Sequence, residues 1–164
     1  MTSDEELARE ASCVFEALKN GSTVDSSAHL LVSPHCMQNK IIDMIDQEIF
    51  KARNGEHGRI RIKINGLSDK AIILKLIEAS CSGVKIELVV RGVCCLKAGV
   101  PDFTENIKIR SIVGRYLEHS RIYIFGDDDN ADIYISSADL MTRNMLRRIE
   151  IGCPIRDDDL PKEI

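Results

Sequence analysis

Hydrophobic residues recur along the chain with two periods, and each period predicts a different element. Between residues 36 and 53 the apolar positions lie three or four apart, which is typical of one face of an α-helix. Between residues 59 and 65 cationic side chains alternate with isoleucine, which is typical of a strand with one buried face. The same criteria predict helices over 3–21, 36–53 and 68–83, and strands over 29–34, 59–65, 84–92, 106–113, 120–125, 131–136 and 147–154.

The order of these elements predicts the fold class. Residues 29–92 read strand, helix, strand, helix, strand, and the chain after residue 106 contains strand-like pieces without long helices. This order predicts an α/β fold with a mixed β-sheet flanked by helices. Strand 84–92 is apolar enough to be central. The buried helix faces are expected to consist of Ala11, Val14, Phe15 and Leu18 in the first helix and Met37, Ile41, Met44, Ile45 and Ile49 in the second.

Composition and charge narrow the functional classes. With 44% hydrophobic and 29% charged residues, the 164-residue chain has the composition of an ordinary globular domain. A net charge of −4 argues against a generally basic nucleic-acid-binding protein. The charge is uneven, however, because residues 1–28 carry six acidic and two basic side chains, whereas residues 91–121 carry six basic and three acidic ones. The middle segment is therefore suited to an anion.

Cysteines and known motifs exclude several kinds of site. The six cysteines include no Cys-x-x-Cys pair, and the adjacent Cys94 and Cys95 are poorly spaced for zinc, so we expect reduced thiols that act as small buried hydrophobic side chains. The histidines at 29, 35 and 57 form no metal-binding spacing. No apolar run approaches the roughly 20 residues that cross a bilayer, which predicts a soluble intracellular protein. The phosphate-binding loop GxxxxGK[ST] and the GxGxxG, HExxH and GxSxG motifs are missing.

Three residues near predicted strand ends are suited to phosphate chemistry. Arg91 ends strand 84–92, and ligands of α/β sheets usually bind at the carboxyl ends of strands. His119 and Arg121 point to the same side if their segment is extended. A guanidinium holds phosphate oxygens, and an imidazole exchanges protons near pH 7. The alternatives are a surface arginine and a solvated pair. A polar cluster downstream either lines the same site or forms a turn or helix cap: Ser136, Ser137, Asp139, Arg143 and Asn144.

Long segments of the chain resemble the carboxy-terminal region of bacterial polyphosphate kinase of the first type. They include RSIVGRYLEHSRIYIFG (110–126) and YISSADLMTRN (134–144), and the resemblance extends from about Thr2 to Ile155. It implies a phospholipase-D-like domain, the second of two in that family, over residues 29–155. Residues 1–28 would then be the lead-in helix and connection from the preceding domain, and residues 156–164 a charged tail.

The resemblance also implies an activity and roles for residues. The family transfers the terminal phosphoryl group of ATP reversibly to polyphosphate, through a phosphohistidine and with Mg²⁺. Arg91 and His119 match its nucleotide- and phosphate-contacting residues. Phospholipase-D sites have His-x-Lys where this chain has His119 and Arg121, so His119 is expected to assist as acid, base or phosphate ligand instead of carrying the phosphoryl group. Arg121 is a further candidate phosphate ligand. The acidic sequence GDDDN (126–130) is either a hairpin turn or a contributor to Mg²⁺ binding, and no other metal site is identifiable.

The same resemblance predicts that the phosphohistidine lies upstream of this chain, which would then be a fragment without kinase activity of its own. Its expected partners are ATP, polyphosphate, upstream domains of the same polypeptide and, in the full-length protein, further copies in a homo-oligomer; neither nucleic acid nor a transmembrane segment is expected. The expected location is the cytoplasm. For the full-length protein, peripheral association with the membrane is an alternative. Three alternatives remain: a non-catalytic polyanion-binding module, an oligomerisation module, and a phosphodiester hydrolase.

Overall fold

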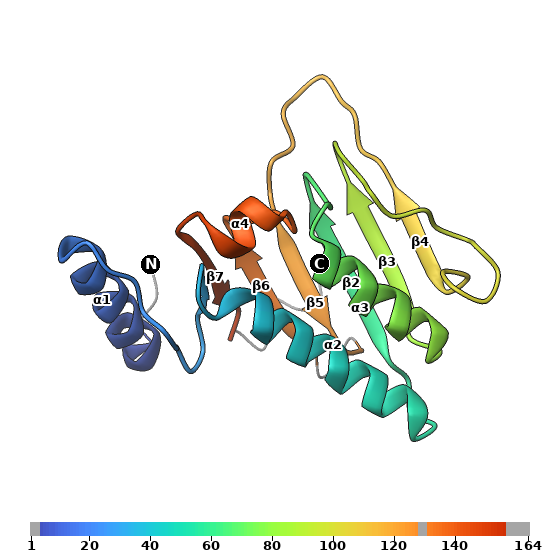
Figure 1. Cartoon of the computed structure of the whole chain (residues 1–164), viewed down its shortest axis with the longest axis horizontal. Helices are drawn as coiled ribbons and strands as arrows, with labels where there is room; N and C mark the ends of the chain where they lie inside the picture. The colour runs from blue at the N-terminus through green and yellow to red at the C-terminus, as the bar shows by residue number, and fades with distance from the viewer. Residues whose placement is uncertain (1–3, 128–130, 157–164) are drawn as a thin grey trace.

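A seven-stranded β-sheet in the order β1-β7-β6-β5-β2-β3-β4 lies at the centre of the structure, a computed structural model that describes residues 4–127 and 131–156 (Figure 1). β2, β3 and β4 are parallel to one another, and the other neighbours are antiparallel. The predicted mixed sheet flanked by helices is confirmed. Its strands are β1 (Leu31–Ser33), β2 (Arg59–Ile64), β3 (Lys85–Val90), β4 (Ile107–Arg110), β5 (Ile122–Phe125), β6 (Asp132–Ser136) and β7 (Glu150–Pro154).

The predicted βαβαβ unit over residues 29–92 is only partly present. β2 and β3 are parallel neighbours joined through α3 (Lys70–Cys81), as expected. β1, by contrast, pairs with β7, where Leu31 lies opposite Gly152, and three strands separate it from β2. β3 is paired on both sides, by β2 and β4, and β4 is the outer strand.

The directions of the strands bring several chain segments to one end of the sheet, at the ends of the strands. β5 is antiparallel to both β2 and β6. The carboxyl ends of β2, β3 and β6 therefore lie at the same end of the sheet, which is also where β5 and β7 begin. Isolated bridges from Leu67 to Cys94 and to Leu140 confirm that the segments after these three strands lie side by side. Residues that follow β2, β3 and β6, or precede β5 and β7, can therefore meet.

Two helices cover one face of the sheet. α2 (Met37–Arg53) and α3 pack against each other and over the isoleucines of β2, at 60, 62 and 64. All five residues predicted for the apolar face of α2 are buried. α3 begins at a side-chain cap, because Asp69 Oδ1 accepts a hydrogen bond from the backbone N–H of Ile72. The large apolar area buried here stabilises the strands whose ends lead to the segments that meet at one end of the sheet.

A smaller apolar cluster holds α1 (Glu5–Lys19) at the β1 end of the sheet (Figure 1). Leu7 and Val14 are buried against Val32 of β1, with Ala11 and Leu18 partly buried beside them. Phe15 is 66% exposed, so its predicted place on the buried face is wrong. The helical period explains this, because Phe15 is rotated about 100° from Val14, away from the stripe that Leu7, Val14 and Leu18 form.

The prediction of buried cysteines is largely wrong. All six are free thiols, but only Cys36 is buried and Cys153 is intermediate, whereas the remaining four are exposed: Cys13, Cys81, Cys94 and Cys95. Position in the element decides the outcome, since Cys81 lies in the last turn of α3 off the stripe formed by Ile72, Leu76 and Ala79. A weak preference of the thiol for the interior does not override helical periodicity.

Two predicted features fall mainly outside the described residues. The acidic sequence GDDDN, predicted as a turn or a contributor to Mg²⁺ binding, includes residues 128–130, which lie outside the described residues, as do residues 157–164 of the charged tail. A short helix that the sequence pattern did not predict, α4 (Thr142–Leu146), follows β6. Within residues 4–127 and 131–156, no helix is long and apolar enough to cross a membrane.

Glu10 ties α1 to the segment that leads into β1. Its carboxylate accepts hydrogen bonds from the backbone N–H groups of His29 and Leu30 at 3.0–3.1 Å and from the Ser27 hydroxyl at 2.5 Å. Burial acts to raise the pKa of this carboxyl group, but these donors outweigh burial and lower the pKa to about 2. The charged form is therefore the one that the folded state stabilises.

Glu10→Gln is expected to lower the free energy of unfolding by about 2 kcal/mol at pH 7, because charge-assisted hydrogen bonds are lost. Since the folded-state pKa of Glu10 lies below its ordinary value of 4.5, the stabilisation is present above pH 4.5 and is lost as the pH falls toward 2. Urea unfolding followed by circular dichroism between pH 3 and pH 7 measures the difference. The control is Glu16→Gln on the exposed side of α1, and equal stability of the two variants at pH 7 would contradict the prediction.

Candidate functional site

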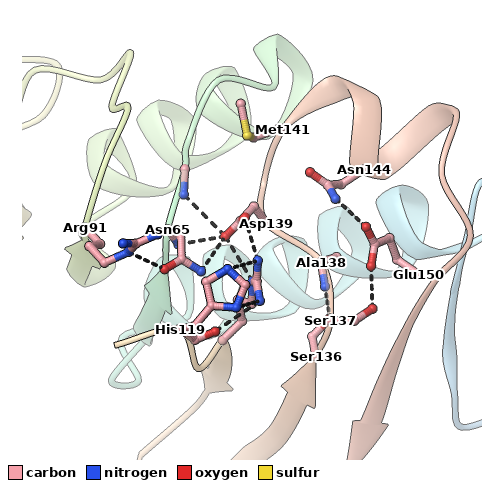
Figure 2. Close-up of polar contacts among 12 residues, drawn as sticks. Asn65, Arg91, His119, Ser136, Ser137, Ala138, Asp139, Met141, Asn144 and Glu150 are labelled. Atoms are coloured by element: carbon pink, nitrogen blue, oxygen red, sulfur yellow. Dashed lines mark hydrogen bonds and ion pairs between the residues drawn. The ribbon is translucent and has the colours of Figure 1, made fainter. Parts of the chain in front are cut away.

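A hollow of about 500 Å³ opens at the end of the sheet where β2, β3 and β6 terminate. Figure 2 shows the polar contacts among residues around it. Four arginines and two carboxylates contribute to its lining, which gives it a positive balance. The lining brings together residues from 65 to 150 in the sequence, and strand order is what makes them neighbours. The residues are Asn65, Gly66, Arg91, Val93, His119, Arg121, Ser137, Asp139, Met141, Arg143, Asn144, Arg148 and Glu150.

Arg91 leaves the end of β3 and is held at one nitrogen. Its Nε donates a hydrogen bond to Asn65 Oδ1 at 2.8 Å. A Cβ on Gly92 would stand 2.9 Å from the backbone oxygen of Asn65, so glycine permits the close approach of these two segments. Within residues 4–127 and 131–156, the terminal nitrogens of Arg91 have no hydrogen-bond or ion-pair partner. A fixed guanidinium thus presents unused N–H donors beside the hollow.

His119 and Arg121 lie against each other at the start of β5. Arg121 Nη1 is 3.0 Å from His119 Nδ1, and Arg121 Nη2 is 3.2 Å from His119 Nε2. The lone-pair directions of the two ring nitrogens diverge in the ring plane, so one guanidinium cannot bond to both in that plane. At most one of the two contacts is therefore an in-plane hydrogen bond, and the guanidinium lies against the imidazole. Arg121 Nη1 also donates to the backbone oxygen of His119 at 3.0 Å, which fixes the two residues together.

Asp139 lies behind these cations and is buried. Its carboxylate accepts from Arg121 Nε at 3.2 Å and Nη2 at 3.0 Å, and from the backbone N–H of Asn65 at 2.7 Å. Burial acts to raise the pKa of Asp139, but the bonds from Arg121 and Asn65 outweigh it and lower the pKa below its usual value. Asp139 is therefore an anion, and it is already paired within the protein.

The polar cluster predicted after strand 131–136 divides between its two interpretations. Ser137, Asp139, Arg143 and Asn144 line the hollow. Ser136 does not line it, and instead accepts from the backbone N–H of Ala138 at 3.0 Å, which is the predicted turn. Each interpretation is therefore right for part of the cluster.

Three polar residues of the lining were not among the candidates that the sequence pattern indicated. Asn65 stands in an Asn-Gly pair that reads as a turn, Arg148 in a presumed strand, and Glu150 at the start of β7. The available signal for Asn65 was its position at the exit of an alternating strand. Glu150 reaches Asn144 Nδ2 and the Ser137 hydroxyl at 2.5 Å each, so it orders the far wall of the hollow.

The chemistry of the lining suits an anion better than a metal ion. Hard cations need several free carboxylate oxygens, whereas Asp139 is paired with Arg121 and Glu150 with Ser137 and Asn144. In the part of the chain that the structure describes, no three His, Cys, Asp or Glu side chains lie close enough to hold a metal. Guanidinium groups beside an imidazole can neutralise phosphate oxygens and take part in proton or phosphoryl transfer.

Comparison with known proteins places this arrangement in a family. The chain is 47% identical over all 164 residues to polyphosphate kinase of Staphylococcus saprophyticus, of which it covers 23%, and 47% identical over 163 residues to polyphosphate kinase 1 of Chlorobaculum tepidum, again 23% of its length. The crystal structure of polyphosphate kinase from Porphyromonas gingivalis matches with a TM-score of 0.91 and 37% identity, over 99% of this chain and 25% of that one.

A more distant likeness concerns the fold alone. Nuc from Salmonella typhimurium, a phospholipase D family member, matches with a TM-score of 0.58 and 14% identity, over 81% of this chain and 85% of that one. The predicted phospholipase-D-like fold is confirmed. The chain spans about a quarter of the length of the polyphosphate kinases that it matches. The family model described as polyphosphate kinase C-terminal domain 2 matches residues 30–164, and the chain therefore belongs to the polyphosphate kinase family as that domain.

Proposed function

We propose that the chain contributes phosphate-binding residues to a polyphosphate kinase that transfers the terminal phosphoryl group of ATP reversibly to polyphosphate. In this proposal a histidine upstream of the chain carries the phosphoryl group. The P–O bond to ADP breaks as a P–N bond forms, and a P–O bond to the polyphosphate end then replaces the P–N bond. The isolated chain is proposed to lack kinase activity because that histidine lies outside it.

The open donors of Arg91 are the observation that carries this proposal. Asn65 fixes the guanidinium at Nε and leaves its terminal N–H groups without a partner among the described residues, beside the hollow. Such a planar donor set matches two oxygens of one phosphate group. The surrounding positive balance favours a polyanion such as ATP or polyphosphate.

His119 and Arg121 are proposed to have different roles in the same site. His119 lines the hollow and assists transfer as acid, base or phosphate ligand. Arg121 directs three of its N–H groups to Asp139 and to the backbone oxygen of His119, so we assign it first to the orientation of His119. Arg121 has two further N–H groups, one on Nη1 and one on Nη2, and direct phosphate contact by Arg121 would use these.

Mg²⁺ is proposed to enter with the nucleotide. The carboxylates of the hollow are engaged by protein donors, so the lining does not fit a resident hard cation. The remaining partners are proposed to be the upstream domains of the same polypeptide and further copies in a homo-oligomer. The cytoplasm is the proposed location.

Arg91→Gln is expected to weaken binding of tripolyphosphate and of MgATP to the chain by about 10- to 100-fold, since hydrogen bonds to charged groups contribute about 1.5–3 kcal/mol. Isothermal titration calorimetry at fixed salt measures both affinities. Arg9→Gln, on the exposed side of α1, is the matched control because it removes the same charge from a helix that does not line the hollow. Equal weakening by the two variants would show that net charge alone, and not this site, holds the anion.

A further inference from the structure

The carboxylate of Asp139 joins two branches of contacts that lead to the two groups proposed to meet phosphate (Figure 2). One branch runs through Arg121, which Asp139 holds at 3.0 and 3.2 Å and whose Nη1 and Nη2 lie 3.0 and 3.2 Å from the ring nitrogens of His119. The other runs through Asn65, whose amide nitrogen is 3.3 Å from Asp139 Oδ1 and whose amide oxygen holds Arg91 Nε at 2.8 Å. The described contacts connect Arg91 and His119 through this one carboxylate.

We infer that Asp139 is a positioning residue that aligns Arg91 and His119 on a single phosphate group of ATP or polyphosphate. This inference rests on the proposed function and adds a residue that acts without touching the substrate. Asp139 is 8% exposed, and its oxygens are occupied by Arg121 and by N–H groups of Asn65 and Gly66. Its effect on an anion therefore passes through the cations that it holds.

Because Asp139 is a negative charge beside a proposed anion site, the inference predicts a change in phosphate affinity opposite to the one expected from charge alone. Coulomb's law alone predicts that neutralising Asp139 strengthens phosphate binding, because a like charge is removed. Positioning predicts the opposite, because a guanidinium that loses its fixed partner must be ordered again when phosphate binds. The two explanations therefore differ in the direction of one measured change.

Asp139→Asn is a nearly isosteric test that acts mainly on one branch. The side-chain oxygen of the introduced asparagine can still accept hydrogen bonds from the backbone N–H groups of Asn65 and Gly66. Its amide nitrogen would face Arg121 Nη2, so that two hydrogen-bond donors would oppose each other. We expect tripolyphosphate affinity to fall by about 10-fold or more, in line with the contribution of a charge-assisted bond. Circular dichroism melting of each variant checks that the fold is retained.

A double-mutant cycle separates positioning from a general structural role. If Asp139 acts through Arg121, then Asp139→Asn in an Arg121→Gln background should weaken tripolyphosphate binding by less than twofold further. A structural role would instead reduce affinity by the same factor in both backgrounds. The Nη2–H resonance of Arg121 gives a second measurement, because its bond to Asp139 Oδ2 should protect it from exchange with water in the unmodified chain, and this protection should be lost in Asp139→Asn.

Asn65→Ala tests the other branch, and it serves alone if Asp139→Asn does not fold. It removes the amide that holds Arg91 and leaves the ion pair of Asp139 with Arg121 in place. We expect a loss of several-fold in tripolyphosphate affinity, and unchanged affinity would overturn the inference.

The outcomes distinguish the inference from the proposed function. An unmodified chain that binds no tripolyphosphate would contradict both. Binding that Arg91→Gln weakens, but that Asp139→Asn leaves unchanged or strengthens, would overturn the role of Asp139 and leave the proposed function in place. Binding that both variants weaken, with non-additive effects of Asp139 and Arg121, would support both.

Discussion

His119→Ala in the complete polyphosphate kinase is expected to reduce phosphoryl transfer from ATP by about 10²- to 10⁴-fold, the range of general acid–base catalysis. The imidazole lines the hollow, as Arg91 does, and is held by its contacts with Arg121. Its removal takes away a group that can exchange a proton or contact the moving phosphoryl group, but leaves the guanidinium of Arg91 in place. MgATP affinity is therefore expected to change by less than threefold. Initial rates of polyphosphate synthesis and equilibrium binding of MgATP measure the two effects.

The matched control is His35→Ala, which removes an exposed histidine outside the hollow and should leave both quantities unchanged. Unchanged turnover in His119→Ala would favour a module that binds the polyanion without taking part in the reaction. Unchanged turnover and binding in both His119→Ala and Arg91→Gln would instead favour a role in oligomerisation. Phosphodiester hydrolysis by the unmodified protein, lost in His119→Ala, would support the hydrolase alternative.

Gly58→Ala is expected to lower the free energy of unfolding by about 3 kcal/mol, at the upper end of the typical range for overpacking. A Cβ at this position would stand 2.6 Å from the backbone oxygen of Glu48 and 3.1 Å from Val84 Cγ2. The nearest neighbour is backbone of α2, which cannot rotate away. α2 would have to move from β2, which would disturb the bond from the backbone N–H of Arg59 to the buried Glu48 carboxylate. Urea unfolding at pH 7 measures the change.

Gly114→Ala is the control for this substitution. Its Cβ would approach no atom more closely than 4.0 Å, and the residue is exposed in the segment between β4 and β5. We expect its stability to lie within about 0.5 kcal/mol of the unmodified chain. A Gly58→Ala variant that was equally stable would mean that α2 and β2 can separate without loss.

Elements with a long, regular pattern were predictable from the sequence. The five apolar residues of α2 and the isoleucines of β2 all occupy the buried faces expected for periods of 3.6 and 2. α4 was not predictable, because five residues cover little more than one turn and no side chain caps its N-terminus. Phe15 also could not be placed from its apolar character alone. It lies beside the buried stripe of α1, and an apolar residue in that position can be either buried or exposed.

Several residues of the candidate site could be singled out from the sequence, but their assembly could not be predicted. Arg91 was singled out from its place after an apolar strand, and His119 with Arg121 from their spacing of two. Their meeting depends on β5 pairing with β2, where Ile122 lies opposite Lys63. Local patterns do not determine which distant strands pair, because any half-buried strand offers similar hydrogen bonds. Asn65 and Asp139 form their contacts only after that pairing is made, so their part in the site required the structure.

The pairing of β1 with β7 sets an order of events during synthesis on the ribosome. Leu31 emerges early, but its partner Gly152 follows more than a hundred residues later. The half of the sheet built from β2, α3, β3 and β4 needs only nearer contacts, so it can assemble while the rest is still being translated. Until β7 arrives, β1 exposes an unpaired backbone edge of apolar residues. A nascent chain stalled before β7 leaves the ribosome should therefore engage chaperones that recognise exposed hydrophobic strands, and release them once β7 has emerged and paired with β1.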